Sequence, residues 1–499
     1  MTVTAVPSPN TAPDTGSDTG SDTGRNDDAY AWLLEPVAEQ RLQRRGGRRR
    51  RRRHRAQRGH SWSNALVPAV ALAPLTFLLA TRLQRLLGDT LLTMYGIGVL
   101  TATLTVMYVS FAWYRDKSIG VAVPQDAPLV SCMLAVKDDV DVIGRCVASI
   151  LASTYPRLEL IVVDDASTDG TDELLSQLSS HDEFTFIRLA KNLGKKRALT
   201  VAASRARGDV FLFTDSDCVV APHAVEQCVK ALIADPTIGG VSGHARALNA
   251  DKTLLSRIQD TWYDGQFAVA KAAESVFGTV TCVSGPMAAF RREAVVNYFP
   301  AWAEDRFLGR EFKFATDRQM TAYVLGQHRV GARLKTQFAD SPFVRDEDYP
   351  ERKWRVEYVA SARVLTNVPE TPRIMLKQQV RWKKSFIRNL FFTGGFLWRR
   401  GPLPAFLFYG HVLWVCAAPV LAFRHLVWLP LHGALFLTGV YLCGVALKGS
   451  VWALAYKVQN PSSPRWLYRP LMSLLSTLCL SWVLPYSAVT LRKSVWSRG

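Results

Sequence analysis

The stretch Leu158-Glu159-Leu160-Ile161-Val162-Val163-Asp164-Asp165 decides the fold of this 499-residue chain. It is a mostly apolar, strand-like run that ends abruptly in two carboxylates. Similar runs lie at 129–136, 184–189 and 210–214, and helix-like segments separate them at 140–153, 170–178, 195–205 and 222–234. Strands that alternate with helices predict βαβ units, so the middle of the chain is predicted to be an α/β domain with a mainly parallel sheet.

Acidic residues stand where these strands end, and ligands of such sheets bind beyond the carboxyl ends of the strands. Asp215 and Asp217 follow the run at 210–214, and residues two apart point to the same side of a strand. Two hard carboxylates on one side suit a divalent cation such as Mg²⁺ or Mn²⁺. Such a cation would neutralise a departing diphosphate. The alternative is a solvated Asp-x-Asp turn, which is common.

Two further positions carry candidate chemistry. Lys195 follows Gly194 at a predicted helix start, together with Lys196 and Arg197; this is either a surface charge run or a cradle for phosphate at a helix N-terminus. Asp317 precedes Arg318. It is either half of an ordinary surface ion pair or a general base that takes the proton from an acceptor hydroxyl.

Gln378-Gln379-Val380-Arg381-Trp382 stands just before a set of apolar segments. Arg381 offers bidentate contacts to phosphate, and Trp382 offers a flat apolar face for a sugar. At a membrane edge, Arg-Trp is also an ordinary interfacial anchor. Ser284-Gly285-Pro286 is likewise either a plain turn or a loop that contacts an acceptor.

The apolar segments are close to the ~20 residues that span a bilayer. Those at 62–80 and 91–114 predict a transmembrane hairpin within residues 61–115. Those at 404–423, 426–447 and 467–491 predict a C-terminal transmembrane region over residues 402–499. Five spans place the C-terminus outside, unless residues 451–458 or the last segment are re-entrant. The basic, aromatic stretch 374–401 predicts amphipathic helices that lie in the interface.

The formal net charge is +19, and much of the excess lies in one tract from Arg41 to Arg58. Before a membrane helix such a tract predicts a cytoplasmic anchor that attracts anionic lipid. Nucleic acid is not an expected partner, because the tract lacks interleaved aromatic residues. Residues 1–60 are predicted to be disordered. The eight cysteines show no CxxC pair or zinc spacing and predict free thiols in a reducing compartment.

The order of these motifs resembles the processive family-2 glycosyltransferases, which include hyaluronan, chitin oligosaccharide, chitin and cellulose synthases. Hyaluronan synthases are the most similar, through Cys282-Val283-Ser284-Gly285-Pro286, the stretch from Lys377 to Phe386, and the ending Trp496-Ser497-Arg498. Nodulation-type chitin oligosaccharide synthases come next. The resemblance implies a cytoplasmic, Rossmann-like GT-A-type domain over residues 125–373, joined to an α-helical transmembrane domain in the plasma membrane.

The resemblance also implies roles for individual residues. Asp317 would be the catalytic base, and Asp215 and Asp217 would hold the metal. The nucleotide sugar would be bound by Asp139, Asp165, Lys195, Asp215 and Arg381, with Asp165 contacting the uridine. The acceptor sugar would be bound by Ser284, Gly285, Gln378 and Trp382. The first strand ends in Lys137-Asp138-Asp139 where the family usually has Tyr-Asn-Glu, and Asp139 would substitute there.

The implied function is an inverting, metal-dependent transfer that extends a growing polysaccharide from UDP-sugar donors and passes it into the membrane. Hyaluronan, made from UDP-GlcNAc and UDP-GlcA, is the favoured product. A single-sugar product, such as a chitin oligomer, poly-GlcNAc or β-glucan, is the first alternative. A catalytically silent membrane scaffold that uses its basic tract to bind lipid or nucleic acid is the second.

Overall fold

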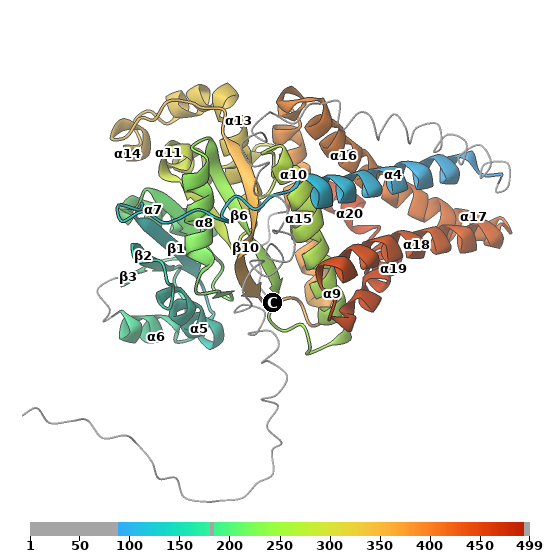
Figure 1. The fold of residues 1–499 in the computed structure, drawn as a ribbon, viewed down its shortest axis with the longest axis horizontal. Coiled ribbons are helices and arrows are strands. Elements are labelled where there is room, and N and C mark those ends of the chain that lie inside the picture. The colour runs from blue at the N-terminus through green and yellow to red at the C-terminus, as the bar shows by residue number, and fades with distance from the viewer. Residues whose placement is uncertain (1–87, 180–183, 494–499) are drawn as a thin grey trace, which may run out of the picture.

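The computed structural model describes residues 88–179 and 184–493. Figure 1 shows an α/β domain beside a group of long helices. The tail at 1–60, its Arg-rich tract, the helix predicted at 62–80 and the ending Trp496-Ser497-Arg498 lie outside the described residues.

Eight strands form one sheet in the order β3-β2-β1-β4-β7-β6-β10-β5. Their bounds are β1 Val130–Val136, β2 Leu158–Asp164, β3 Phe184–Arg188, β4 Val210–Phe213, β5 Val219–Val220, β6 Ile238–Ala247, β7 Ala288–Arg291 and β10 Arg355–Thr366. A separate pair is formed by β8 (Arg306–Phe307) and β9 (Arg310–Glu311). The first four strands are parallel, as predicted. The sheet as a whole is mixed, because β7 runs antiparallel between β4 and β6.

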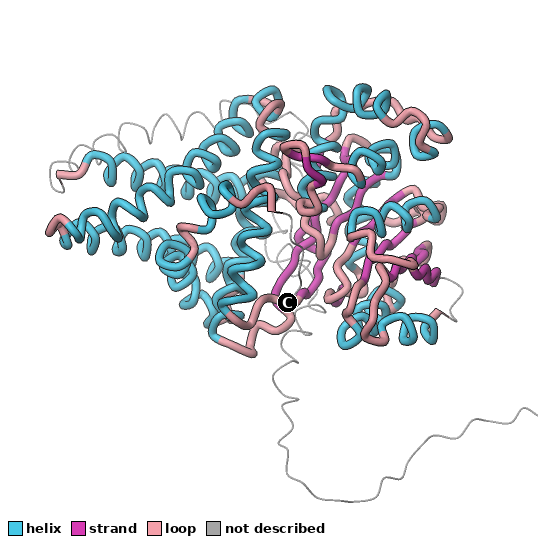
Figure 2. The backbone as a smooth tube through the Cα atoms, turned by 180° about the vertical axis from the view of Figure 1, so that it is seen from behind, coloured by secondary structure: helices cyan, strands magenta, loops and turns pink. Residues whose placement is uncertain are grey.

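Helices surround this sheet and bury its strands (Figures 1 and 2). Every residue of β1 and β2 is buried, as in sheets covered on both faces. The helices of this part are α5 Val140–Leu151, α6 Thr171–Leu178, α7 Lys195–Arg205, α8 Ala224–Ala234, α9 Leu254–Gly265, the π-helix η4 Gln266–Lys271, α10 Ala272–Val276, α11 Arg292–Val295, η5 Val296–Tyr298, α12 Phe299–Ala303, α13 Thr316–Gln337 and α14 Pro342–Arg345.

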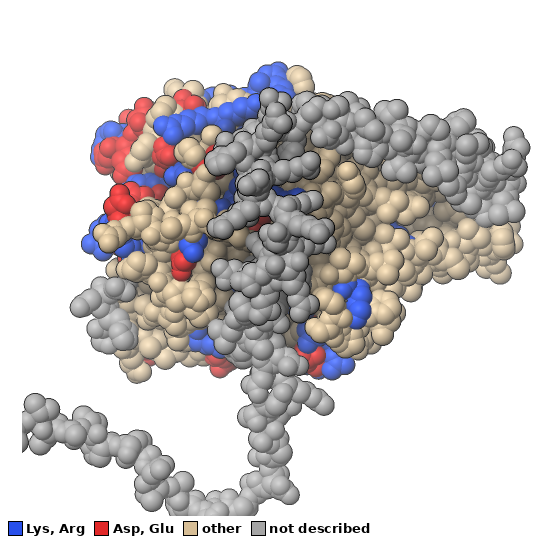
Figure 3. Space-filling model, in the orientation of Figure 1, with Lys and Arg blue, Asp and Glu red and all other residues tan. Residues whose placement is uncertain are grey.

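Three described helical arms are long and apolar enough to cross a membrane. The first is α4, Thr90–Trp113. The second runs from Pro402 to Leu431 and consists of α16 (Pro402–Phe423), η7 (Arg424–Trp428) and α17 (Leu429–Leu431). The third is α18, Leu435–Gln459. Figure 3 shows charged side chains gathered over the α/β domain, whereas the exposed helical end has few.

The C-terminal helices have bounds that differ from those of the predicted spans. Residues 426–431 belong to the second arm, Pro402–Leu431, because the chain turns at Gly433, whose φ of +80° suits glycine. Residues 451–458 lie inside α18 and form no separate re-entrant segment. Before these arms, α15 (Pro372–Thr393) and η6 (Leu397–Arg400) occupy the stretch predicted to be amphipathic.

The last apolar segment is a bent pair rather than one straight helix. Residues Pro464–Cys479, comprising η8 (Pro464–Tyr468) and α19 (Arg469–Cys479), meet α20 (Val483–Val489) at a 45° bend. Both ends of the pair touch the α/β domain. At the start, Arg465 pairs with Asp251 at 2.5 Å. After the end, Leu491 packs against Phe312 and Phe314.

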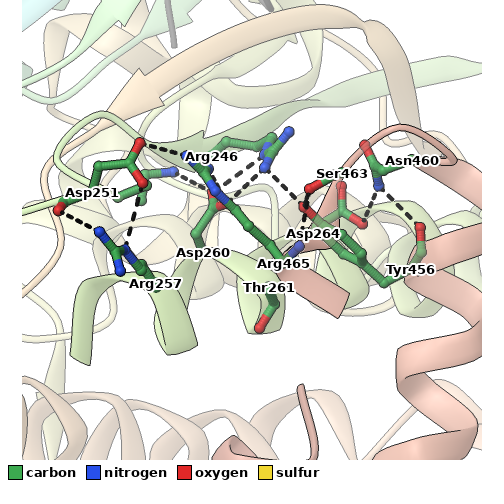
Figure 4. A network of polar contacts seen from close by, with 12 residues as sticks. Arg246, Asp251, Arg257, Asp260, Thr261, Asp264, Tyr456, Asn460, Ser463 and Arg465 are labelled. Carbon is green, nitrogen blue, oxygen red and sulfur yellow. Dashed lines mark hydrogen bonds and ion pairs between the residues drawn. The ribbon is translucent and has the colours of Figure 1, made fainter. Parts of the chain in front are cut away.

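A buried ion-pair network joins the α/β domain to α18 and η8 (Figure 4). Asp260 of α9 accepts hydrogen bonds from Arg246 of β6 at 2.6 Å and from Arg465 of η8 at 3.0 Å. Arg246 also donates to the Tyr456 hydroxyl of α18 at 3.2 Å. Because Asp260 and Arg246 are buried, this network fixes α18 against β6 and α9.

Candidate active site

Asp215 and Asp217 lie just past the end of β4, beside the buried thiol of Cys218. The possible ligand atoms of these three residues all lie within 4.8 Å of one another. Burial, Asp217 and Asp215 raise the pKa of the Cys218 thiol, and its soft sulfur suits Mg²⁺ or Mn²⁺ less well than oxygen does. The other two donors are hard carboxylates. This donor set fits a divalent cation such as Mg²⁺ or Mn²⁺.

Lys195 extends from the first residue of α7 to pair with Asp215. The turn before α7 is held by Asp165, whose two carboxylate oxygens accept the N–H groups of Leu193 and Gly194 at 2.6 and 2.8 Å. Burial raises the pKa of Asp165. In the structure Asp165 therefore shapes the turn that presents Lys195, and its contact with uridine stays a prediction.

The neighbouring Lys196 points away from this carboxylate site. Its ammonium donates to Asp305 at 3.1 Å and to the Phe312 carbonyl at 3.0 Å, and it is buried there. Arg388 of α15 bonds the other oxygen of Asp305 at 2.6 Å. The three residues therefore tie α7 to α15, and of the run Lys195-Lys196-Arg197 only Lys195 lines the cavity described below.

Asp139 and the Ser284 turn flank the same carboxylates. Asp139, at the N-terminus of α5, accepts a hydrogen bond from the Ser216 hydroxyl at 2.5 Å. The Ser284 turn directly precedes β7, and β7 runs antiparallel to β4, so the turn lies where β4 ends. Gly285 sits so close that an added Cβ would lie 2.9 Å from Asp215 Oδ2.

Asp317 is the second residue of α13, whose first turn follows Ala315 in a left-handed conformation with φ of +63°. One carboxylate oxygen of Asp317 accepts the backbone N–H of Arg318 at 2.9 Å. The other faces the thiol of Cys282, with Sγ to Oδ2 at 3.4 Å. Asp317 and Arg318 both line the cavity, so this pair does not belong to the outer surface of the domain.

Gln378, Arg381 and Trp382 lie on α15, within its first three turns. The side-chain oxygen of Gln378 is buried and has no hydrogen-bond partner within the described part of the chain, so a bound ligand would satisfy it. Trp382 stacks on Trp262 of α9, with ring centroids 5.7 Å apart and planes 28° apart. Trp382 is therefore packed against the α/β domain, rather than serving as a lipid-facing anchor.

One cavity of about 1590 Å³ joins these groups. Ten of the eleven predicted site residues line it, and Asp165 does not: the lining includes Asp139, Lys195, Asp215, Asp217, Ser284, Gly285, Asp317, Gln378, Arg381 and Trp382. The same cavity continues between α4, α16, α18 and α19. The acidic site and the interior of the helical arms therefore form one continuous space.

Sequence reasoning missed two residues of this site. Trp262 supports Trp382 from behind, and Lys271 contacts the Ser284 turn. The signal for Lys271 was one lysine inside the otherwise apolar run Phe267-Ala268-Val269-Ala270-Lys271-Ala272-Ala273. No comparable signal marked Trp262, because a tryptophan on a helix is most often part of a core.

Part of the chain is similar to a known family of enzymes. Residues 131–299 match the family model described as glycosyl transferase family 2. That range contains all but the first residue of β1, the strands β2 to β7, Asp215, Asp217 and the Ser284 turn. Over these residues the chain is therefore similar to family 2 glycosyltransferases, in agreement with the prediction of a hexosyltransferase enzyme.

The chain is also similar to individual enzymes that make sugar polymers or transfer N-acetylglucosamine. The chain is 28% identical over 422 residues to a hyaluronan synthase of Streptococcus pyogenes, covering 82% of this chain and 91% of that one. It is 29% identical over 323 residues to an N-acetylglucosaminyltransferase of Rhizobium meliloti (strain 1021), covering 61% of this chain and 70% of that one. These relatives confirm the predicted resemblance to processive family-2 enzymes. Among solved structures, a mannosyltransferase from Pyrobaculum calidifontis in complex with GDP-Man and Mn²⁺ matches with a TM-score of 0.48 and 20% identity, covering 81% of this chain and all of that one.

Proposed function

We propose that this protein is a membrane-embedded hyaluronan synthase, which polymerises UDP-GlcNAc and UDP-GlcA and passes the product through its own helices. The α/β domain would face the cytoplasm and the helical arms would cross the plasma membrane. The hyaluronan synthase relative, matched over 91% of its length, supports the polymerising activity.

The observation that carries the choice of product is the charge inside the helical part of the cavity. Lys448 of α18 and Arg469 of α19 line it, each over a tryptophan ring, at 3.5 Å from Trp414 and 5.1 Å from Trp452. No acidic residue lines it between α4, α16, α18 and α19, as far as the chain is described. Cations inside a membrane domain are costly and mark a pathway. Positive charges beside flat apolar rings suit a sugar chain that carries carboxylates, such as one containing glucuronic acid, better than neutral chitin or glucan.

At the donor end, four residues of the chain would bind the metal ion and the diphosphate of the donor. Asp215 and Asp217 would hold Mg²⁺ or Mn²⁺, which supplies charge neutralisation for the departing UDP. Lys195 and Arg381 would contact the diphosphate as cations, and Arg381 can do so with two parallel hydrogen bonds. Asp165 keeps the turn before Lys195 in place.

At the acceptor end, Asp317 would take the proton of the attacking hydroxyl as general base. Trp382, fixed by Trp262, would offer its free face to the terminal sugar, and Gln378 would accept a hydrogen bond from a sugar hydroxyl. The inverted β-linkage follows from attack opposite the leaving UDP. The lengthened chain would then advance past Trp382 into the helical part of the cavity.

The test is a donor experiment with the purified full-length protein and Mg²⁺ or Mn²⁺. Polymer that requires both UDP-GlcNAc and UDP-GlcA, and that a hyaluronan-specific hydrolase degrades, is the expected result. Full polymer growth on UDP-GlcNAc alone would instead establish the chitin-type alternative. No UDP release with any donor mixture would favour the silent scaffold. In Asp317→Asn, polymer synthesis is expected to fall by about 10²- to 10⁴-fold, the usual contribution of a general base.

A further inference from the structure

The loop between α10 and β7 lies between Asp317, the predicted base, and Asp215, one of the predicted metal carboxylates. Its Cys282 thiol contacts Asp317 at 3.4 Å, and Gly285 closely approaches Asp215. The Val283 N–H donates to Thr321 of α13 at 2.9 Å, so the loop also rests on the helix that carries Asp317. Residues 281–285 therefore lie between the predicted base and the predicted metal carboxylates.

A single buried ammonium, that of Lys271, holds the centre of this loop. It donates to the Cys282 carbonyl at 2.5 Å, to the Ser284 hydroxyl at 2.6 Å and to the Ser242 hydroxyl of β6 at 3.1 Å. An ammonium has three protons, and these contacts use all of them. The Phe267 ring lies 4.6 Å below the charge. The three hydrogen-bond acceptors of Lys271 thus all belong to the protein. Lys271 would therefore act on a substrate only through the loop that it holds.

The start of the same loop is held by Glu274, one turn further along the helix. The carboxylate of Glu274 accepts the Thr281 N–H at 3.0 Å and the Thr281 hydroxyl at 3.1 Å. Lys271 and Glu274 are three residues apart, which puts them on one face of a helix. Together the two side chains form hydrogen bonds to residues 281–284 from the same side.

The backbone explains how Lys271 reaches the loop. It is the last residue of the π-helix η4, which interrupts the rod formed by α9 and α10. A π-turn contains one extra residue, which rotates the side chains after it by about 100° relative to an uninterrupted α-helix. Such turns are frequent at functional sites. Trp262 lies before the π-turn and stacks on Trp382. Lys271 lies at the end of the π-turn and contacts the loop.

From these contacts we infer that Lys271 is a positioning residue for the acceptor, which fixes the Cys282–Ser284 loop so that the acceptor hydroxyl is presented to Asp317. The inference rests on the proposed function. It predicts a specific defect: without Lys271 the donor still binds and reacts, but water replaces the poorly placed acceptor more often.

The experiment compares Lys271→Met, Lys271→Arg and Lys230→Met in the full-length protein. Lys230 is a matched control, since it pairs with Glu226 at 2.6 Å on α8 and does not line the cavity. UDP release and sugar incorporation are measured together, with the KM of each donor. In Lys271→Met, incorporation is expected to fall by about ten-fold, as for a displaced reactant, while the donor KM changes little and UDP released per sugar incorporated rises. Lys271→Arg should recover part of the coupling, and Lys230→Met should match the wild type.

Several outcomes would overturn the inference. One is an unchanged ratio of UDP release to incorporation in Lys271→Met. Another is a raised donor KM with that ratio unchanged, which would assign Lys271 to the donor side. If Lys271→Met does not fold, Ser242→Ala decides instead, because it removes one partner of the ammonium, does not line the cavity, and should show the same uncoupling in milder form; normal coupling there would refute the role. A wild-type protein that makes no polymer refutes the proposed function itself, which separates the two failures.

Discussion

Replacing Gly285 with alanine tests whether the acceptor loop and the metal carboxylates are as tightly packed as the structure shows. The new Cβ would lie 2.9 Å from Asp215 Oδ2 and 3.3 Å from Oδ1, whereas ordinary contact begins at 3.4 Å. Asp215 must then move by about 0.5 Å, which is the whole tolerance of a working catalytic group. Its partner Lys195 must follow or lose the ion pair.

A misplacement of 1 Å can cost about 10²-fold in rate, so half of that displacement predicts a loss of about ten-fold, or about 1.4 kcal/mol of transition-state stabilisation. The assay is the initial rate of UDP release at saturating donors, repeated over a Mn²⁺ titration. We expect kcat to fall and the Mn²⁺ concentration for half-maximal rate to rise.

The control is Gly144→Ala on α5, where the added Cβ meets only Leu174 Cδ2 at an ordinary 3.7 Å. This variant should keep the wild-type rate. If Gly285→Ala also keeps its rate and Mn²⁺ dependence within about two-fold, which corresponds to roughly 0.4 kcal/mol, the close approach of Gly285 to Asp215 has no catalytic consequence and the reasoning fails.

Three further perturbations address other parts of the molecule. Burial lowers the pKa of Lys383 to about 8, so raising the pH through that value removes a positive charge from the cavity wall. Activity should fall with it, and Lys383→Arg should keep activity at higher pH because arginine stays protonated; identical alkaline limbs in rate–pH profiles would refute this. Trp262→Leu removes a ring pair worth about 1 kcal/mol, so shorter products are expected on size-exclusion chromatography, and wild-type lengths would contradict the support of Trp382. Asp260→Asn leaves Arg246 and Arg465 without their shared carboxylate, which should cost about 3 to 5 kcal/mol of stability in thermal unfolding, and an unchanged melting temperature would count against the network.

The first half of the α/β domain could be predicted from sequence because its strands are apolar runs with sharp polar ends. The run predicted at 158–163 is β2, Leu158–Asp164, and the helix predicted at 195–205 is α7, Lys195–Arg205. At such a strand end the candidate carboxylates lie two positions apart in sequence, so the sequence could predict that Asp215 and Asp217 lie together.

The second half gave no such pattern. Strand β6 reads Ile-Gly-Gly-Val-Ser-Gly-His-Ala-Arg-Ala, with glycines in place of large apolar residues. The structure shows why: a Cβ on Gly239 would lie 2.8 Å from Trp354, and one on Gly240 would lie 2.8 Å from Phe290. The core here is filled by side chains from distant parts of the chain, and that information is absent from the local sequence.

The same limit applies to the site. Asp317 and Trp382 could be predicted from their motifs, but the residues that hold them in place could not. Trp262 lies 120 positions before its stacking partner, and the reach of Lys271 depends on a π-turn. Supporting residues of this kind are specified by tertiary contacts, which sequence spacing does not report.

The bent pair at residues 464–489 brings the chain back to the α/β domain. Lys384 of α15 donates to the Lys493 carbonyl at 2.7 Å, so the end of the described chain is attached to the helix that carries Arg381 and Trp382. A protein fused directly after Lys493 would therefore begin beside the α/β domain. Removing Leu491 and the residues after it would uncover Phe312 and Phe314, which lie just before Asp317 in the chain.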